Sequence, residues 1–317
     1  MNSIRIGTRA SALALAQAGM VKNAVEKNFS GVRVEIIKMT TKGDRITDIP
    51  LHKIGSRGLF IKEIEESLLR EEIDIAVHSL KDLPASQNES LCIGAFLTRE
   101  NPGDVLISER YGSLSEIPAG AHIGTGSRRR ESQLKNFRPD ILVEPLRGNV
   151  ETRIKKSSGG NLDAIIIAAA GVIRLGLAGK IREYLPRDLF IPSPGQGIIA
   201  AQIRKNDTAS AEILEKINDE NAGMCYAVER EFFLETGGGC FLPIGALCEK
   251  NSSGYTIHGY IGDEKGENVF RESASFSIYD PLQGKKLAQK LLDAGGKRVL
   301  FDIREKENSD NKREGRY

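Results

Sequence analysis

Tryptophan is absent from the 317-residue sequence, histidine and cysteine occur four times each, and no long uninterrupted hydrophobic run is present. The longest apolar stretch, Ala164 to Ile173, is far shorter than the ~20 residues that a membrane-spanning helix requires. The N-terminal apolar stretch Ala12 to Ala18 lacks the basic segment of a secretion signal, and Arg9 interrupts the residues before it. The net charge is only +2, so the composition requires neither nucleic acid nor a membrane as partner. We therefore expect a cytoplasmic protein.

The few histidines and cysteines also limit the chemistry. The histidines match no metalloprotease or hydrolase motif, and the cysteines form neither a CxxC pair nor a zinc-type spacing. A disulfide framework is implausible in a cytoplasmic chain of this length. No metal site is expected, and each cysteine is either a buried small residue or a reactive thiol: Cys92, Cys225, Cys240 and Cys248.

Two halves of the chain share a plan. Each begins with an apolar strand, an IGT turn and a helix start, at Ile6–Gln17 and again at Ile123–Leu134. Each continues with an amphipathic helix and a continuously apolar strand, as expected for a parallel sheet covered on both faces. These later elements are Leu59–Arg70 with Ile73–Val77, and Val150–Lys156 with Ala164–Ile167. We predict two α/β domains, with a chance likeness of short strands as the alternative.

A third region begins near Asp219. The pattern predicts a helix over Ala222–Glu235 that stops at Gly237–Gly239, two or three strands, and a helix over Pro281–Ala294. The strands are Ile244–Cys248, Tyr255–Ile261 and Val269–Ile278. This pattern indicates a small α+β domain. The charged tail 304–317 lacks apolar periodicity and is expected to be disordered.

Seven arginines fall at predicted turns, strand ends or helix starts. Ligands of α/β sheets bind at such places, and helix N-termini add backbone donors. The guanidinium group suits carboxylates and phosphates. Any one of these arginines could be an ordinary surface residue, but the run after IGTG favours a polyanion site. The seven are Arg9, Arg57, Arg129, Arg130, Arg147, Arg153 and Arg174.

Two further motifs carry candidate chemistry. Asp82 lies in HSLKDLP, after a predicted strand; it could merely cap a turn, or it could stabilise a cation if it faces a basic cleft. Cys240 lies in GGGCFLPIG, where glycines allow close approach and nearby arginines would lower the pKa of the thiol. The other cysteines lie within predicted elements and are expected to pack. Gly195–Ala200 fits GxGxxA but follows prolines rather than a strand, so we do not interpret it as a dinucleotide site.

These motifs together resemble the hydroxymethylbilane synthase (porphobilinogen deaminase) family. The resemblance runs from Ile4 to about Phe301, through IGTRASALALAQA, TKGDR, KIGSRGLF, DIAVHSLKDLP, GTGSRRRESQL, LRGNVETR, DAIIIAAAGVIRLGL, PGQG and GGGCFLPIG in family order. Four positions depart from the usual family residue. They are Arg57 for Lys, Gly126 for Ser, Arg128 for Leu and Phe241 for Gln.

The resemblance implies three domains. Two are hinged α/β domains like those of periplasmic binding proteins, comprising residues 1–98 with 197–217, and residues 103–192. A small α+β domain over 219–303 would carry Cys240 on a loop reaching into the cleft. The segment Thr41 to Gly58, rich in glycine and charge, is expected to act as a lid.

The resemblance also implies an activity. Four porphobilinogen molecules would be joined stepwise, with loss of ammonia, onto a dipyrromethane held by a thioether to Cys240, and hydroxymethylbilane would be released by hydrolysis. Asp82 would bind pyrrole N–H groups and stabilise the cation left by the departing amine. Further residues would hold the cofactor (Lys81, Thr125, Ser127, Arg129, Arg130, Arg153) or the substrate chain (Arg9, Ser11, Gln17, Arg147, Arg174). A monomer is expected. The alternative is a binding protein for a small anion, which would carry no covalent pyrrole.

Overall fold

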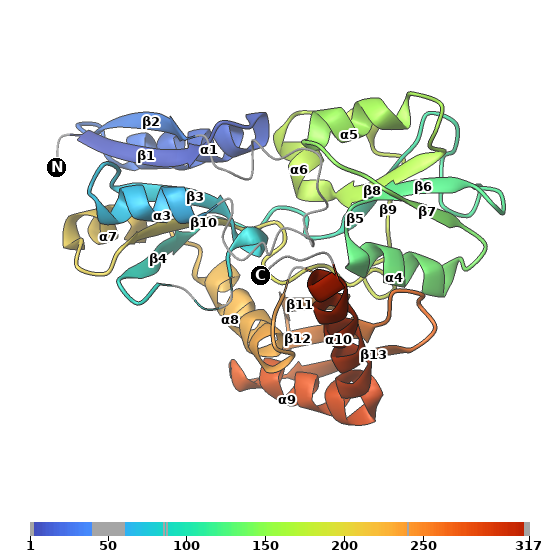
Figure 1. The fold of residues 1–317 in the computed structure, drawn as a ribbon. Coiled ribbons are helices and arrows are strands. Elements are labelled where there is room, and N and C mark those ends of the chain that lie inside the picture. Colours follow the sequence, from blue (N-terminus) through green and yellow to red (C-terminus); the bar gives the residue numbers. More distant parts are fainter. Residues whose placement is uncertain (1–2, 40–60, 85, 87, 240, 314–317) are drawn as a thin grey trace.

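The computed structural model describes residues 3–39, 61–84, 86, 88–239 and 241–313, which form three β-sheets (Figure 1). We call the parts built on them the first, second and third units. The first two are five-stranded sheets covered by helices, and the third is a three-stranded sheet with helices beside it. The predicted class of two α/β parts and a small α+β part is confirmed.

The first unit has the strand order β2–β1–β3–β10–β4. Its strands β1, β2 and β3 are parallel, whereas β10 runs antiparallel to both β3 and β4. Helices α1 and α7 pack on one face and α3 on the other, which explains why the strands are apolar on both sides. The bounds are β1 Ser3–Arg9, α1 Ala12–Asn28, β2 Arg33–Met39, α3 Lys62–Leu69, β3 Ile75–Ser79, β4 Leu91–Phe96, β10 Ile199–Arg204 and α7 Thr208–Glu215.

The second unit repeats this order as β7–β6–β8–β5–β9. Its strands β6, β7 and β8 are parallel, and β5 runs antiparallel to β8 and β9. The expected duplication of plan is therefore present at the level of strand direction. The bounds are β5 Asp104–Ile107, β6 His122–Thr125, α4 Arg128–Phe137, β7 Leu142–Pro145, α5 Val150–Ser157, β8 Ala164–Ala168, α6 Ala169–Arg174 and β9 Glu183–Tyr184.

The third unit is an antiparallel sheet of β11, β12 and β13, with its own core around Phe232, Ile257 and Leu287. Its bounds are α8 Glu220–Glu235, β11 Ile244–Asn251, β12 Gly254–Gly262, β13 Val269–Phe276, α9 Leu282–Leu291 and α10 Lys297–Arg313. The expectation of a disordered tail is wrong for residues 304–313, because α10 continues through them. The helix is anchored in the core by Leu300 and Ile303.

The chain passes from the first unit to the second between β4 and β5 and returns between β9 and β10 (Figure 1). A short helical turn, η2 (Leu80–Asp82), follows β3 where the units meet. Among the described residues, no helix combines the length and hydrophobicity needed to cross a membrane.

Candidate active site

The carboxyl edge of the first sheet collects several predicted site residues. Strands β1 and β3 are parallel, so Arg9 and Ser79 end at the same edge. Ser11 caps α1, its hydroxyl accepting from the Ala14 amide at 3.3 Å. Gln17, one turn further along, donates from Nε2 to the Ser79 hydroxyl at 2.8 Å. The first unit therefore presents Arg9, Ser11 and Gln17 close together.

The second unit presents the starts of its helices in the same way. Ser127 caps α4 by accepting from the Arg130 amide at 3.4 Å, and Thr125 ends the preceding strand. Arg153 lies in the first turn and a half of α5, where its Nε donates to the Gly148 carbonyl at 2.8 Å. Arg174 ends α6 and donates to the Gly197 carbonyl at 2.6 Å, in the segment returning to the first unit.

Three buried charges form the centre of the site. Asp104, at the start of β5, accepts from Arg129 at 2.8 Å and lies 2.9 Å from the Arg130 guanidinium. Burial alone would raise the pKa of Asp104, but the two arginines outweigh it and hold that pKa well below its usual range. One carboxylate thus faces two guanidinium groups in a dry environment, which leaves an excess of positive charge.

Gln196 connects this centre to the first unit. Its Nε2 donates to Asp104 at 2.8 Å and to the Pro102 carbonyl at 2.6 Å. Its Oε1 accepts from Lys81 and from Arg130, each at 3.3 Å. Sequence reasoning missed both Asp104 and Gln196. The available signals were an acidic residue opening the apolar run DVLI and a polar residue between the glycines of PGQG.

The cations facing one another across the two units are desolvated. Burial, followed by the charge of Arg130, lowers the pKa of Lys81 to about 8, while Asp82 acts in the opposite direction. Burial, again followed by Arg130, lowers the pKa of Arg153 to about 10, with Asp82 opposing and Arg147 adding to the shift. Such an assembly is stabilised by a bound anion, because an anion restores the charged forms.

Two buried arginine nitrogen atoms have hydrogen-bonding capacity that a ligand would satisfy. Among the described residues, the Nε atoms of Arg130 and Arg174 are buried without a hydrogen-bond partner. Buried donors are normally paired in proteins. These atoms and the excess of cations fit a ligand with several carboxylates, such as a dipyrromethane with two per ring.

Asp82 is held at the end of η2, which Leu80 and Leu83 anchor in the core. The Leu83 amide donates to the Leu80 carbonyl at 3.0 Å and closes the turn. The side chain of Asp82 is exposed, unlike the buried Asp104. An exposed carboxylate on a hydrogen-bonded turn, whose charge acts on Arg153, is suited to stabilising a cation.

Some predicted residues cannot be placed. Cys240, Arg57 and the expected lid Thr41–Gly58 lie outside the described residues. The glycines before Cys240 have positive φ of 79°, 50° and 142°, conformations that glycine adopts freely. At Gly126, a Cβ would lie 2.6 Å from the Leu146 carbonyl oxygen, so the departure from the usual family serine matches a close backbone approach.

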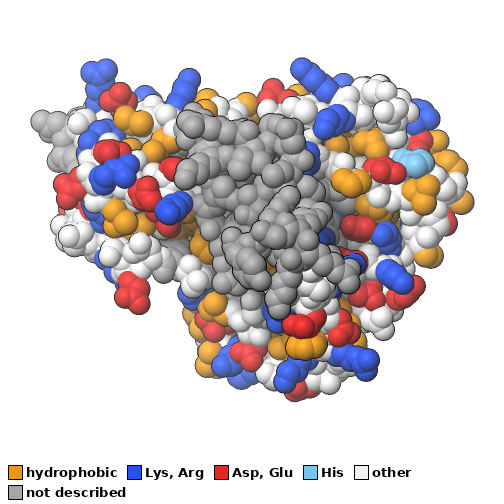
Figure 2. Space-filling model, in the orientation of Figure 1, with side chains coloured by type: hydrophobic (Ala, Val, Ile, Leu, Met, Phe, Trp, Pro, Cys, Tyr) orange, Lys and Arg blue, Asp and Glu red, His pale blue; other side chains and the backbone are white. Residues whose placement is uncertain are grey.

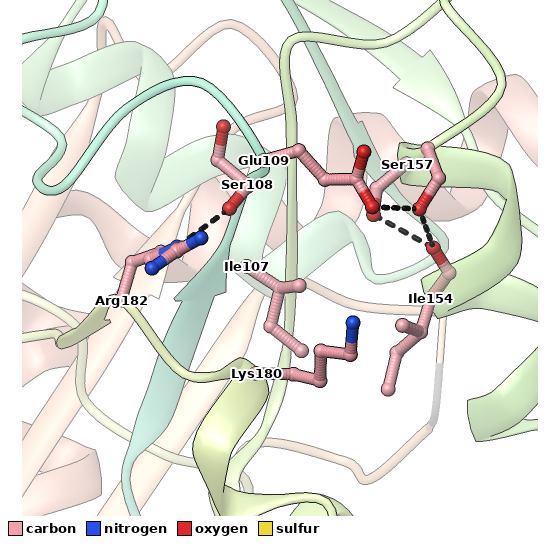
Figure 3. A pocket seen from close by; sticks show the side chains of 8 residues that line it. Ile107, Ser108, Glu109, Ile154, Ser157, Lys180 and Arg182 are labelled. Carbon is pink, nitrogen blue, oxygen red and sulfur yellow. Dashed lines mark hydrogen bonds between the residues drawn. The ribbon is translucent and has the colours of Figure 1, made fainter.

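A separate cavity in the second unit contains none of the predicted site residues. It has a volume of about 280 Å³ and lies in the second unit between Ile107 and Ile154, beside Lys180 (Figure 3). Its serine hydroxyls are engaged: Ser158 donates to Glu109 at 2.6 Å and Ser157 to the Ile154 carbonyl at 2.7 Å. On the face in Figure 2, acidic and basic side chains are interspersed over the described surface.

Fold and site together describe a protein with two α/β units that join at a desolvated cationic cluster, which is suited to a small polycarboxylate. The sequence model of a family described as porphobilinogen deaminase, dipyromethane cofactor binding domain, matches residues 4–212. The chain belongs to the porphobilinogen deaminase family. This membership favours the enzyme over the alternative of an anion-binding protein.

Relatives extend the match to nearly the whole chain. The porphobilinogen deaminase of Syntrophomonas wolfei is 45% identical over 305 residues, covering 96% of this chain and 100% of that protein. That of Geobacter sulfurreducens is 43% identical over 313 residues, covering 98% of each. Among solved structures, the methionine-binding protein MetQ is similar at 12% identity and a TM-score of 0.42, covering 72% of this chain and 91% of that one.

Proposed function

We propose that this protein joins four porphobilinogen molecules, with release of ammonia, and releases the linear product by hydrolysis. The observation that carries the proposal is that Lys81, from the first unit, and Arg130, from the second, both donate to the Oε1 atom of Gln196. The charge of Asp82, from the first unit, also acts on Arg153 of the second. Loss of ammonia from the substrate leaves a cationic pyrrole, whereas its acetate and propionate remain anionic. The site offers one exposed carboxylate for the cation and several cations for the acids.

Asp82 is the proposed catalytic residue. Its carboxylate would accept the pyrrole N–H and stabilise the positive charge that develops as the amine departs. The anchored turn holds the carboxylate before the charge develops, which lowers the cost of reorganisation. General acid–base and electrostatic roles of this kind contribute typically about 10²–10⁴-fold in rate.

The cationic and polar residues would hold the carboxylates. Charge-assisted hydrogen bonds to a buried carboxylate contribute about 1.5–3 kcal/mol each. Arginine can bind such a group through two parallel bonds. We assign the cofactor to Lys81, Thr125, Ser127, Arg129, Arg130 and Arg153, and the growing chain to Arg9, Ser11, Gln17, Arg147 and Arg174.

The dipyrromethane cofactor would be attached to Cys240 by a thioether. When bound, it supplies the pyrrole carbon to which the first substrate is joined. The glycines at 237–239 would let this part of the chain approach the site, and a thiol near arginines is readily ionised.

The three units would correspond to three domains. We propose residues 1–98 with 197–217 as the first, 103–192 as the second and 219–303 as the third, with the chain crossings between them. The protein would act as a cytoplasmic monomer on a small-molecule substrate, without nucleic acid or a membrane as partner, and Thr41–Gly58 would act as a lid.

The intact mass of the purified protein, with and without added porphobilinogen, tests the proposal. We expect a mass two pyrrole units above the sequence mass, absent in Cys240→Ser, and a ladder of single-pyrrole steps after substrate is added. A mass that stays at the sequence value with substrate present would contradict the function. An adduct that persists in Cys240→Ser would contradict only the attachment point.

A further inference from the structure

Helix α10 contacts both the arginine-bearing helix α4 and the chain just before Cys240. The Arg304 guanidinium donates to the Thr236 carbonyl at 2.8 Å, and Thr236 stands four residues before Cys240 in the sequence. Glu307, one turn further along α10, lies 2.8 Å from the guanidinium of Arg128, the first residue of α4. One helix thus links the two parts of the chain that the proposed function brings to a single cofactor.

These contacts come from one face of α10. Leu300 and Ile303 are buried in the core of the third unit, and Arg304 and Glu307 follow at the spacing of adjacent turns. The two charged residues are partly buried, whereas their neighbours Glu305, Lys306 and Asn308 are exposed. Leu300 and Ile303 fix the helix in the core of the third unit. Arg304 and Glu307 then contact Thr236 and Arg128.

Helix α4 offers a matching face to the third unit. Arg128, Ser132 and Asn136 are spaced four residues apart and therefore lie on one side of the helix. The Ser132 hydroxyl lies 2.7 Å from the Tyr260 hydroxyl, and the Asn136 amide donates to the Gly266 carbonyl at 3.0 Å. The same helix carries Arg129 and Arg130, which contact Asp104.

The ion pair of Arg128 is a network rather than a single contact. Arg128 also lies 3.2 Å from Glu264, which in turn pairs with Lys306 at 2.7 Å. Its side chain is only 18% exposed, so solvent screens the pair less than it would screen an ordinary surface pair. A leucine, the usual residue in the family that the sequence resembles, would not form this network.

We propose that Arg128, Arg304 and Glu307 are positioning residues that set α4 relative to the chain before Cys240. The inference rests on the proposed function, because it gives these contacts a cofactor to align. Hydrogen bonds from Arg129 and Arg130 to a carboxylate depend steeply on distance and angle, so a small displacement of α4 weakens them together. The three residues act through this alignment and do not touch the substrate.

The variant Glu307→Lys places two cations against each other and should displace α4. We expect kcat/KM for porphobilinogen to fall roughly five- to tenfold, within the range of measured couplings between contacting residues. Hydrogen exchange should also become faster at the backbone amides of the first turns of α4 and of the segment after Thr236. The matched control is Asp302→Lys on the same helix, where the side chain is 66% exposed; it should stay within about twofold of the unchanged protein.

The double variant R128E/E307K restores opposite charges between these two positions, but the new acid then lies beside Glu264. We therefore expect partial recovery of the lost activity and exchange protection. A loss caused by the substituted lysine itself, and not by the broken ion pair, would not recover in this way. The inference is overturned if Glu307→Lys behaves like Asp302→Lys, or if the double variant stays as impaired as the single one. If the unchanged protein itself consumes no porphobilinogen, the proposed function fails instead, and the exchange rates still decide whether α10 holds α4.

Discussion

The first and second units share a strand order but supply different groups to the site. In the first, the turn after β3 carries Asp82, whereas the corresponding turn after β8 in the second runs into the alanines that begin α6. In the second, the helix after β6 begins with three arginines, whereas α1 after β1 begins with Ala12 and Leu13. Two units with the same strand order can therefore bring complementary groups together, provided that different residues follow the equivalent strands.

The largest expected effect comes from removing the acid of the first unit. Asp82→Asn keeps the size of the side chain but removes the charge that opposes the developing cation. We expect kcat to fall about 10²–10⁴-fold, while intact mass still shows the two-pyrrole adduct. Turnover of porphobilinogen is the measurement, with the exposed Asp302→Asn as control. Near-normal turnover would show that Asp82 is not catalytic and that the first unit does not supply the essential carboxylate.

The next effect comes from the charge balance of the second unit. Asp104→Asn leaves the buried Arg129 and Arg130 without their carboxylate, and loss of one partner of a buried pair costs about 3–5 kcal/mol in free energy of unfolding. Urea denaturation measures this cost. The control is Asp140→Asn, which breaks an exposed pair with Arg138 and should cost less than about 1 kcal/mol. Equal losses would mean that the buried centre has no special energetic role.

Gly126 tests how closely the backbone packs after β6 in the second unit. Because a Cβ there would meet the Leu146 carbonyl oxygen, Gly126→Ser should lower the free energy of unfolding by about 1–3 kcal/mol. Thermal unfolding is the measurement. Gly31→Ser is the control, since a Cβ at Gly31 has no neighbour within 4 Å. A neutral Gly126→Ser would show that the backbone shifts to accept the usual family residue.

Lys81, a buried cation of the first unit, gives the smallest expected effect. With its pKa lowered to about 8, it is charged at pH 7 and loses its charge as the pH rises through 8. Affinity for an anionic substrate should therefore fall, and KM should rise a few-fold between pH 7 and 9. Lys81→Arg keeps the charge and should flatten this dependence. The same rise in Lys81→Arg would assign the titration to another group.

Local patterns predicted most of the elements. The apolar runs at 73–77 and 164–167 correspond to β3 and β8, and the helix predicted over 222–235 corresponds to α8. These predictions are confirmed because the spacing of apolar residues along an element shows whether one or both of its faces are buried. The resemblance to a family identified Asp82 and the arginines as candidates, and in the structure the charges of Asp82 and Arg130 both act on Arg153.

The failures share a cause. The charged stretch 304–313 continues the helix that Leu300 and Ile303 anchor, and its Arg304 and Glu307 contact Thr236 and Arg128, which are distant in sequence. Gln196 and Asp104 likewise acquire their roles only when the second crossing meets β5. A local sequence pattern does not show which distant residues will meet in the folded chain. These contacts therefore could not be predicted from the pattern alone.

The position of β10 has a consequence for the order in which the chain can form its structure. This strand lies between β3 and β4, yet it follows them by the whole length of the second unit. As the chain leaves the ribosome, the second sheet has all its strands between residues 104 and 184 and can close at once. The first must wait with two strand edges unpaired until residue 204 has emerged. Such delayed, long-range pairing is slow and exposes edges to misassembly, so nascent chains released between these points should depend most on chaperones.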